Sequence, residues 1–296
     1  MPKLRSYLSL IKFSHTIFAM PFAMIGFFIG LIQRRNNKEG GETTDNLWVL
    51  LVLVILCMVF ARSSAMAFNR YLDRKFDGAN PRTAIREIPS GVIKANSVLL
   101  FTIINCLLFV ACTFFINRLC FYLSPIALAV VLGYSYTKRF TPLCHLILGL
   151  GLSLAPIGAY LAVTGSFALL PILFSLAVIF WVSGFDIIYA LQDEEFDRSQ
   201  QLYSIPAWLG KSKALRVSEI LHLMSAAAVV IAGIYGEFGW LYWIGGAIFV
   251  GMLIYQHSIV KPGDLTKVNI AFMTANGIAS VVFAIFVIAD LFGSRA

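Results

Sequence analysis

Acidic side chains are concentrated in two short regions of this 296-residue chain. Only 13% of the residues are charged, and eight of the fifteen Asp and Glu residues fall between residues 73 and 87 or between residues 186 and 197. The eight are Asp73, Asp77, Glu87, Asp186, Asp193, Glu194, Glu195 and Asp197. These two regions therefore hold most of the candidate chemistry.

The first region has the pattern Asn69-x-x-x-Asp73-x-x-x-Asp77. In one continuous helix, at about 100° per residue, these three side chains span roughly 80° of a single face. Arg62 lies seven residues before Asn69 and shares that face, about two turns deeper in the same apolar segment. The spacing predicts one polar face that begins inside the apolar segment and continues beyond it.

The second region ends with Asp193-x-x-x-Asp197, and Asp186 lies seven residues before Asp193. By the same helical geometry the three aspartates fall within roughly 40° of one another. Each region follows a long apolar segment, so each is expected at the end of a helix. The two faces would form opposite walls of one site if both helices end on the same side of a membrane.

Close carboxylates repel one another unless cations lie between them. Mg²⁺ binds a few carboxylates together with water and the oxygen atoms of a substrate phosphate. We therefore expect the two acidic motifs to hold a magnesium–diphosphate between the two walls. The other interpretation is a set of solvated helix-end charges balanced by neighbouring arginines and lysines. The matching spacing in two regions favours the metal site.

The elements that must position these residues are apolar helices. Hydrophobic residues make up 59% of the chain, and segments of bilayer-spanning length recur along it. These segments are too long for strands and lack strict alternation. We predict an all-α integral membrane protein with about nine transmembrane helices around a central cavity. The spans are expected at 13–32, 47–68, 97–116, 119–136, 143–163, 168–189, 220–235, 238–255 and 270–292.

The positions of Lys and Arg predict the orientation of these helices. With the N-terminus inside, the inside segments hold 17 of the 23 basic residues and the outside segments hold 5. This asymmetry places the N-terminus, both acidic regions and the opening of the cavity on the cytoplasmic side. The net charge of +8 then reflects a membrane surface, so we expect a lipid bilayer as partner and no nucleic acid.

The two aspartate motifs resemble the paired signatures of the UbiA superfamily of intramembrane prenyltransferases. The flanking segments are similar to its bacterial 4-hydroxybenzoate polyprenyltransferase-like branch. They read Asn80-Pro-Arg-Thr-Ala-Ile-Arg86-Glu-Ile-Pro-Ser-Gly91, Tyr134-Ser-Tyr-Thr-Lys-Arg139 and Tyr203-Ser-Ile-Pro206. The resemblance covers nearly the whole chain, and it implies a single membrane domain over residues 1–296 in a bacterial inner membrane.

The resemblance implies Mg²⁺-dependent transfer of a (poly)prenyl group from an isoprenyl diphosphate to an aromatic acceptor in respiratory quinone biosynthesis. Both 4-hydroxybenzoate and a dihydroxynaphthoate fit as acceptors, and no protein partner is implied. The resemblance implies that Asn69, Asp73 and Asp77 hold one side of the metal–diphosphate, and that Asp193 and Asp197 hold the other. Asp73 and Asp193 would lead the two motifs. Lys138 and Arg139 end the fourth predicted span on the same side, where they either contact the diphosphate or anchor the helix at the membrane surface.

Several other residues are candidates for substrate contacts. Arg82 and Arg86 lie in the loop after the first motif, and they either close over the diphosphate or face lipid. Arg62, within a span, either pairs with Asp186 or recognises an acceptor carboxylate. The rings of Tyr134 and Tyr189 could stabilise an allylic cation.

Polar and small residues inside the spans are weaker candidates. A lone polar residue in a span, such as Asn276 or His15, usually makes an interhelical hydrogen bond. Gly149, Gly151, Ala155 and Gly158 either open a groove for the prenyl tail or allow close helix packing.

Two other classes of protein share some of these features. A transporter also uses intramembrane carboxylates, but here the acids cluster at one membrane face, and only Arg62 and Asp186 lie deeper. A phospholipid-headgroup transferase also uses helix-borne aspartates, but its tighter Asp-x-x-Asp-Gly pattern does not occur in this sequence.

Overall fold

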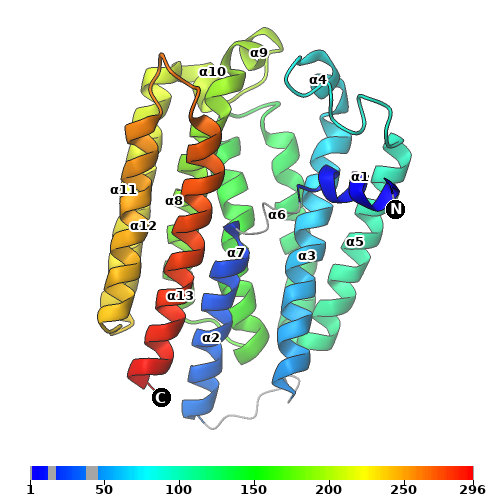
Figure 1. Ribbon diagram of the computed structural model, residues 1–296. Coiled ribbons are helices and arrows are strands. Elements are labelled where there is room, and N and C mark those ends of the chain that lie inside the picture. Colours follow the sequence, from blue (N-terminus) through cyan, green and yellow to red (C-terminus); the bar gives the residue numbers. More distant parts are fainter. Residues whose placement is uncertain (1, 13–17, 38–45, 296) are drawn as a thin grey trace.

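The computed structural model describes residues 2–12, 18–37 and 46–295 as a bundle of helices, without a strand in these ranges. The long helices run up and down the bundle (Figure 1). They are α2 (Met20–Asn37), α3 (Leu47–Leu72), α5 (Ala95–Ile116), α6 (Arg118–Thr137), α7 (Cys144–Thr164), α8 (Leu169–Ala190), α11 (Lys211–Tyr235), α12 (Trp240–Ile259) and α13 (Asn276–Arg295). The prediction of an all-α membrane fold is confirmed.

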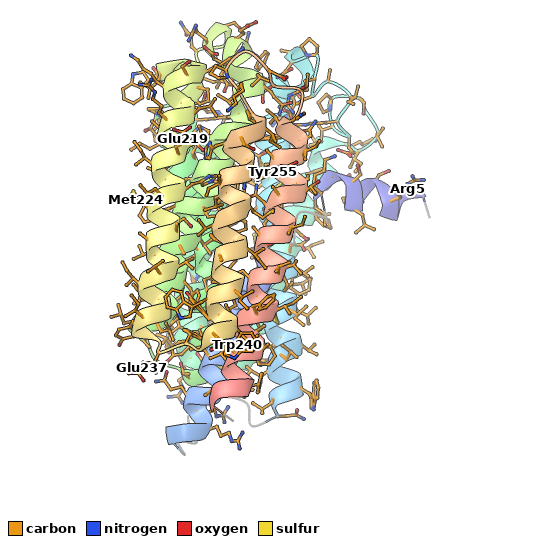
Figure 2. The ribbon with its side chains drawn as sticks, turned by 60° about the vertical axis from the view of Figure 1, so that its left-hand side comes forward. Arg5, Glu219, Met224, Glu237, Trp240 and Tyr255 are labelled. Atoms are coloured by element: carbon orange, nitrogen blue, oxygen red, sulfur yellow. The ribbon has the colours of Figure 1, made fainter. Side chains whose placement is uncertain are left out.

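The short elements lie between or before the long helices. They are α1 (Pro2–Leu10), α4 (Arg74–Ala79), the 3-10 turn η2 (Leu191–Asp193), α9 (Glu194–Ser199), α10 (Ile205–Leu209) and the π-helical turn η3 (Ile270–Ala275). Helix α1 projects sideways from the bundle, as the position of Arg5 in Figure 2 shows. Helices α4, α9 and α10 gather at one end of the bundle.

Each predicted span coincides with a long helix, although the boundaries differ. Among the described residues, seven helices are long and apolar enough to cross a membrane. Helices α2 and α12 are not among the seven, so a count of nine crossings stays a prediction. Helix α11, which corresponds to the predicted span 220–235, begins at Lys211. It starts nine residues before the predicted span because a polar first turn continues the helix beyond its apolar part. Residues 13–17 of the first predicted span lie outside the described residues.

The outer face of the bundle is apolar. Met224 on α11 and Tyr255 on α12 are 42% and 43% exposed, and Trp240 at the start of α12 is 70% exposed. Glu237 marks the end of the bundle away from α4, α9 and α10. Exposed aromatic and aliphatic side chains between charged ends are typical of a surface that faces lipid.

Close helix contacts are made where side chains are small. A Cβ atom at Gly149 of α7 would lie 2.5 Å from the carbonyl oxygen of Ile179 on α8. A Cβ atom at Gly26 of α2 would lie 1.9 Å from the carbonyl oxygen of Pro156 on α7. Both glycines therefore allow backbones to approach closely, as in other membrane helix bundles. For Gly149 the structure supports the packing explanation.

The two acidic motifs emerge at the same end of the bundle, but neither lies on one continuous helix. Helix α3 ends at Leu72, and Asp73 joins it to α4 with φ −85° and ψ 3°. Asp193 follows α8 in the same way, with φ −105° and ψ 4° at the start of α9. The expectation of one straight helical face through each motif is therefore wrong. A break in the backbone turns α4 and α9 across the mouth of the bundle, so that each motif bends around the cavity.

Candidate active site

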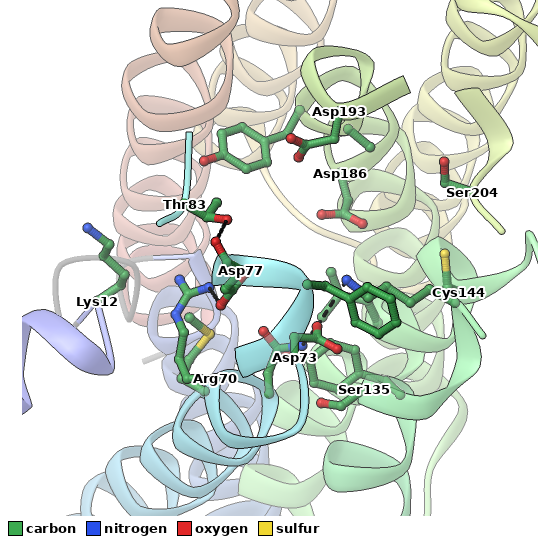
Figure 3. A pocket seen from close by; sticks show the side chains of 18 of the residues that line it. Lys12, Arg70, Asp73, Asp77, Thr83, Ser135, Cys144, Asp186, Asp193 and Ser204 are labelled. Carbon is green, nitrogen blue, oxygen red and sulfur yellow. Dashed lines mark hydrogen bonds and ion pairs between the residues drawn. The ribbon is translucent and has the colours of Figure 1, made fainter. Parts of the chain in front are cut away.

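A polar cavity of about 490 Å³ opens among the helix ends that carry the two motifs. Its walls come from α3, α4, α6, α7, α8 and α9, and from the loop that follows α4. Figure 3 shows Asp73 and Asp77 on one wall and Asp186 and Asp193 on the other, with open space between them. The lining contains six Asp or Glu side chains and six Arg or Lys side chains. Its formal charge is therefore close to zero.

Asp73 is 3% exposed and is held by three donors. Lys138 Nζ lies 3.0 Å from its Oδ2 atom, and Arg139 Nη2 lies 2.9 Å from Oδ1. Asn69, one turn earlier on α3, donates a hydrogen bond of 3.1 Å to Oδ2. The basic pair at the end of α6 thus contacts the first motif directly.

Asp77 on α4 is 6% exposed and has one close basic partner. Arg86 Nη1 lies 2.6 Å from its Oδ1 atom, and Thr83 donates a hydrogen bond of 3.0 Å to its main-chain carbonyl. The Oδ2 atom has Arg70 Nη1 at 4.0 Å and makes no hydrogen bond with any residue that the structure describes. A buried carboxylate oxygen without a hydrogen bond is costly and is available to a ligand.

Asp193 is bound by residues from the opposite wall. Asn80 donates a hydrogen bond of 3.1 Å to Oδ1, and Arg82 contacts both carboxylate oxygens through Nε and Nη2. Arg82 also donates to the hydroxyl of Tyr189 over 3.1 Å. Burial alone would lower the pKa of Arg82, but the hydrogen bonds and charge of Asp193 outweigh burial and raise it. These contacts hold the loop after α4 against the end of α8.

Asp197, on α9, also lines the cavity and accepts a hydrogen bond from the side chain of Ser204. The neighbouring Glu194 is turned away from the cavity, because it pairs with Arg198 at 2.8 Å and lies 3.9 Å from Lys211. The two residues therefore have different environments, although both belong to the same acidic run.

Asp186 and Arg62 lie deeper in the same cavity. Asp186 does not pair with Arg62; its Oδ2 atom lies 2.7 Å from Nδ1 of His145 on α7. In the described part of the chain Arg62 makes no hydrogen bond or ion pair, and its Nε atom is buried without a partner. The ion pair that the sequence allowed is thus not formed, and both side chains remain directed at the cavity.

The donor set fits magnesium if a substrate completes the coordination. The side chains are carboxylate and amide oxygens, which are hard ligands, and Asp77 Oδ2 has no hydrogen-bond partner. Within the described ranges, no three His, Cys, Asp or Glu side chains are already gathered as a metal site. Mg²⁺ commonly binds one or two carboxylates together with substrate phosphates, so an incomplete set on each wall is consistent with it.

A second, apolar pocket of about 350 Å³ adjoins the polar cavity between α3, α5, α6 and α7. Arg62, Tyr134, Leu148 and Leu152 line both spaces. Gly158 lines the apolar pocket, and a Cβ atom there would meet no atom within 4 Å. The prediction of a groove is thus supported at Gly158.

The remaining predicted candidates separate into two groups. Tyr134 and Tyr189 both line the polar cavity. Asn276 does not: it accepts hydrogen bonds from Trp181 on α8 and Gln256 on α12, and it donates to the carbonyl groups of the π-helical turn. It therefore joins three segments of the bundle. His15 lies outside the described residues.

The lining residues that were not predicted from the sequence include three with polar or charged side chains close to the motifs: Arg70, Asn80 and His145. Asn80 lies in a segment quoted for its resemblance, and that context was its only signal. His145 follows a cysteine at the start of a span, and nothing in the local sequence indicates that it faces Asp186.

The fold and the two cavities define a helical membrane protein with a charged cavity at one end of the bundle and an apolar pocket beside it. The profile of the UbiA prenyltransferase family matches residues 40–278, and the chain belongs to this family. It is therefore a prenyltransferase, and this assignment replaces the transporter and headgroup-transferase hypotheses.

Curated relatives and solved structures agree with the family. The 4-hydroxybenzoate octaprenyltransferase of Paraburkholderia phytofirmans is 31% identical over 237 residues, which cover 80% of this chain and 82% of that protein. The apo structure of a UbiA homolog from Aeropyrum pernix K1 has a TM-score of 0.78 at 28% identity, over 95% of this chain and 98% of that one. A UbiA homolog from Archaeoglobus fulgidus bound to DMAPP and Mg²⁺ has a TM-score of 0.75 at 20% identity, over 97% and 99%.

Proposed function

We propose that the enzyme transfers a (poly)prenyl group from an isoprenyl diphosphate to a hydroxylated aromatic carboxylate, with Mg²⁺, in respiratory quinone biosynthesis. The acceptor that the curated relatives favour is 4-hydroxybenzoate, and a dihydroxynaphthoate offers the same carboxylate and hydroxyl groups. The observation that carries the proposal is the junction of a cavity walled by two aspartate motifs with an apolar pocket. The first space suits a diphosphate, and the second suits a hydrocarbon tail.

The metal–diphosphate would be held by Asn69, Asp73, Asp77, Asp193 and Asp197. When bound, Mg²⁺ supplies positive charge that stabilises the diphosphate as it leaves. A lining with no net formal charge supports this role, since it offers no surplus positive charge for a diphosphate.

The basic residues have a second task in this proposal. Lys138, Arg139, Arg82 and Arg86 now neutralise the motif aspartates. If these carboxylates held a metal ion, the four cations would be free to turn to the phosphate oxygens. Arginine suits bidentate phosphate contacts and lysine supplies a point charge. Arg82 and Arg86 would then close the loop after α4 over the substrate.

The prenyl chain would extend from the diphosphate into the apolar pocket. Tyr134 lies at the junction of the two spaces, and Tyr189 lines the polar cavity beside Arg82. Both rings would then be close to the place where the allylic cation forms. An aromatic ring stabilises a nearby cation by about 0.5–2 kcal/mol. Gly158 keeps the pocket open farther along its length.

The aromatic acceptor would bind with its carboxylate on Arg62. The guanidinium has no hydrogen-bond or ion-pair partner within the described ranges, lines both spaces, and sits where a charge without a partner is costly. A carboxylate would supply the missing partner and would direct the ring toward the diphosphate. We place the N-terminus and the cavity mouth in the cytoplasm, because basic residues predominate on that side.

Release of diphosphate by the purified protein tests the proposal. The protein in detergent is given geranyl diphosphate with 4-hydroxybenzoate or 1,4-dihydroxynaphthoate, in Mg²⁺ or in EDTA, and longer donors are tested in parallel. We expect Mg²⁺-dependent release together with a prenylated aromatic product. Folded protein that yields no product with any donor and acceptor would refute the proposal.

A further inference from the structure

Asp186 has an unusual environment for a carboxylate in this cavity. Its Oδ2 atom is bound to His145 Nδ1 at 2.7 Å, and its Oδ1 atom has no hydrogen-bond partner among the described residues. The side chain is 24% exposed, and Figure 3 shows it directed into the open space between the walls. One carboxylate oxygen is therefore fixed and the other faces the substrate space.

The imidazole of His145 is oriented from both sides. The main-chain N–H of Ile205 donates to Nε2 over 3.3 Å, so that nitrogen is the acceptor in the ring. The ring proton is then on Nδ1, which donates it to Asp186. His145 is 3% exposed, so its position is also set by packing. The ring N–H of His145 therefore holds Oδ2 of Asp186 in place and leaves Oδ1 directed at the substrate space.

The aspartates of the two motifs have different partners from Asp186. Asp73, Asp77 and Asp193 are each in contact with an arginine or a lysine. Asp197 has Ser204 as its partner, but it lies on α9 at the mouth, beside Asp193. Asp186 is thus the one carboxylate of the described lining that is deep in the cavity and has neither an arginine or lysine partner nor a place in a metal motif.

Asp186 also lies at the depth where the acceptor is placed. It precedes Asp193 by seven residues on α8, and Arg62 precedes Asn69 by seven residues on α3, so each lies about 10 Å below its motif. The two side chains are too far apart for an ion pair, and both line the cavity. A ring whose carboxylate is on Arg62 therefore presents its hydroxylated end toward the α8 wall.

We propose that the Asp186 carboxylate is the base that removes the proton lost by the aromatic ring, and that His145 positions it. This assignment rests on the proposed function. As the ring carbon beside the hydroxyl bonds to C1 of the prenyl group, the C1–O bond breaks and its electron pair leaves on the diphosphate. The hydrogen on that ring carbon then passes as a proton to Asp186 Oδ1, and the C–H electron pair restores the aromatic ring.

The test compares native enzyme with Asp186→Asn, which keeps the shape and removes the base. We expect prenylated product to form about 10²- to 10⁴-fold more slowly, the range typical of general acid–base catalysis. Acceptor deuterated at the ring carbons should react at the native rate in the native enzyme, because ring deprotonation there is fast. In the variant it should show a primary deuterium isotope effect, because proton loss has become limiting.

Two variants test the role of His145. His145→Asn keeps a short N–H donor at the place of Nδ1, whereas His145→Leu removes it. We expect turnover in the order native, Asn, Leu, with an isotope effect that appears in the leucine variant and an unchanged KM for the prenyl diphosphate. Equal losses in both variants without an isotope effect would make His145 a packing residue only.

Binding measurements separate the outcomes. Titration of each variant with Mg²⁺ and geranyl diphosphate should give the native affinity. Lost affinity in Asp186→Asn would refute a base and make Asp186 part of the metal–diphosphate site. Native turnover, or slow turnover without the isotope effect, would also refute it. Product missing even from the native enzyme would instead refute the proposed function, and this assignment with it.

Discussion

Replacement of Arg62 by leucine should weaken acceptor binding and leave the protein at least as stable as the native enzyme. Loss of a charged residue from a protein interior usually destabilises the protein, because its partner is left as an unpaired buried charge. This cost is not expected for Arg62, because the guanidinium makes no ion pair or hydrogen bond with the described residues. Its stabilising partner is proposed to be the substrate.

The magnitude follows from the contact that is lost. A hydrogen bond to a charged group contributes about 1.5–3 kcal/mol, and about 1.4 kcal/mol corresponds to a factor of ten. The KM for 4-hydroxybenzoate should therefore rise roughly 10- to 150-fold in Arg62→Leu. An arginine at the centre of a spanning helix costs about 2.5–3.5 kcal/mol, so its removal should not lower the melting temperature.

The assay measures KM for both substrates and the melting temperature in detergent. A neutral acceptor such as 4-hydroxybenzyl alcohol serves as the matched control, because native and variant enzymes should bind it alike. An equal rise in KM for the prenyl diphosphate, or a fall in melting temperature of several degrees, would refute the reasoning. Either result would mean that Arg62 has a structural partner.

Three further predictions concern the two walls and the apolar pocket. Asp193→Asn should abolish Mg²⁺-dependent product formation in protein that remains folded by size-exclusion chromatography, because it removes a carboxylate from the second motif. Arg82→Ala should strengthen binding of Mn²⁺ to the substrate-free enzyme, measured by electron paramagnetic resonance, because Arg82 competes for Asp193; turnover should fall, and exposed Lys75→Ala should change neither. Gly158→Leu should raise KM for long prenyl diphosphates more than for geranyl diphosphate, because its side chain fills the apolar pocket, whereas Gly133→Leu, also free of clashes but outside that pocket, should not.

Each of these expectations can fail in a distinct way. Full activity in Asp193→Asn would remove the second motif from the metal–diphosphate site. Unchanged or weaker Mn²⁺ binding in Arg82→Ala would mean that the arginine does not compete with metal. A uniform change in KM for short and long donors in Gly158→Leu would place the prenyl chain elsewhere.

The sequence by itself determined the helical membrane fold and the family, and it located the two aspartate motifs that line the cavity. Composition and segment length identify spanning helices because a bilayer demands apolar segments that satisfy their own backbone hydrogen bonds. The spacing of Asp73 and Asp77, and of Asp193 and Asp197, repeats one pattern at the end of two such segments. The apolar segments and the aspartate spacing are both local patterns in the sequence, so they could be recognised without knowledge of any tertiary contact.

Local spacing was misleading where the helices end. The motifs were placed on straight helical faces, but the backbone breaks at Asp73 and at Asp193. Residues close to the membrane surface can leave a helix because water and side chains there satisfy the freed backbone groups. Periodicity continues through such a break in the sequence, so it cannot locate it.

Only the tertiary structure decided which partner each polar residue has. An ion pair between Asp186 and Arg62 was one of two alternatives, but Asp186 is bound to His145 from another helix, and Arg62 has no hydrogen-bond or ion-pair partner among the described residues. Asn80 and Arg82 reach Asp193 across more than a hundred residues of chain. These pairings depend on the rotation and depth of helices that pack against one another, and no local pattern in the sequence records either quantity.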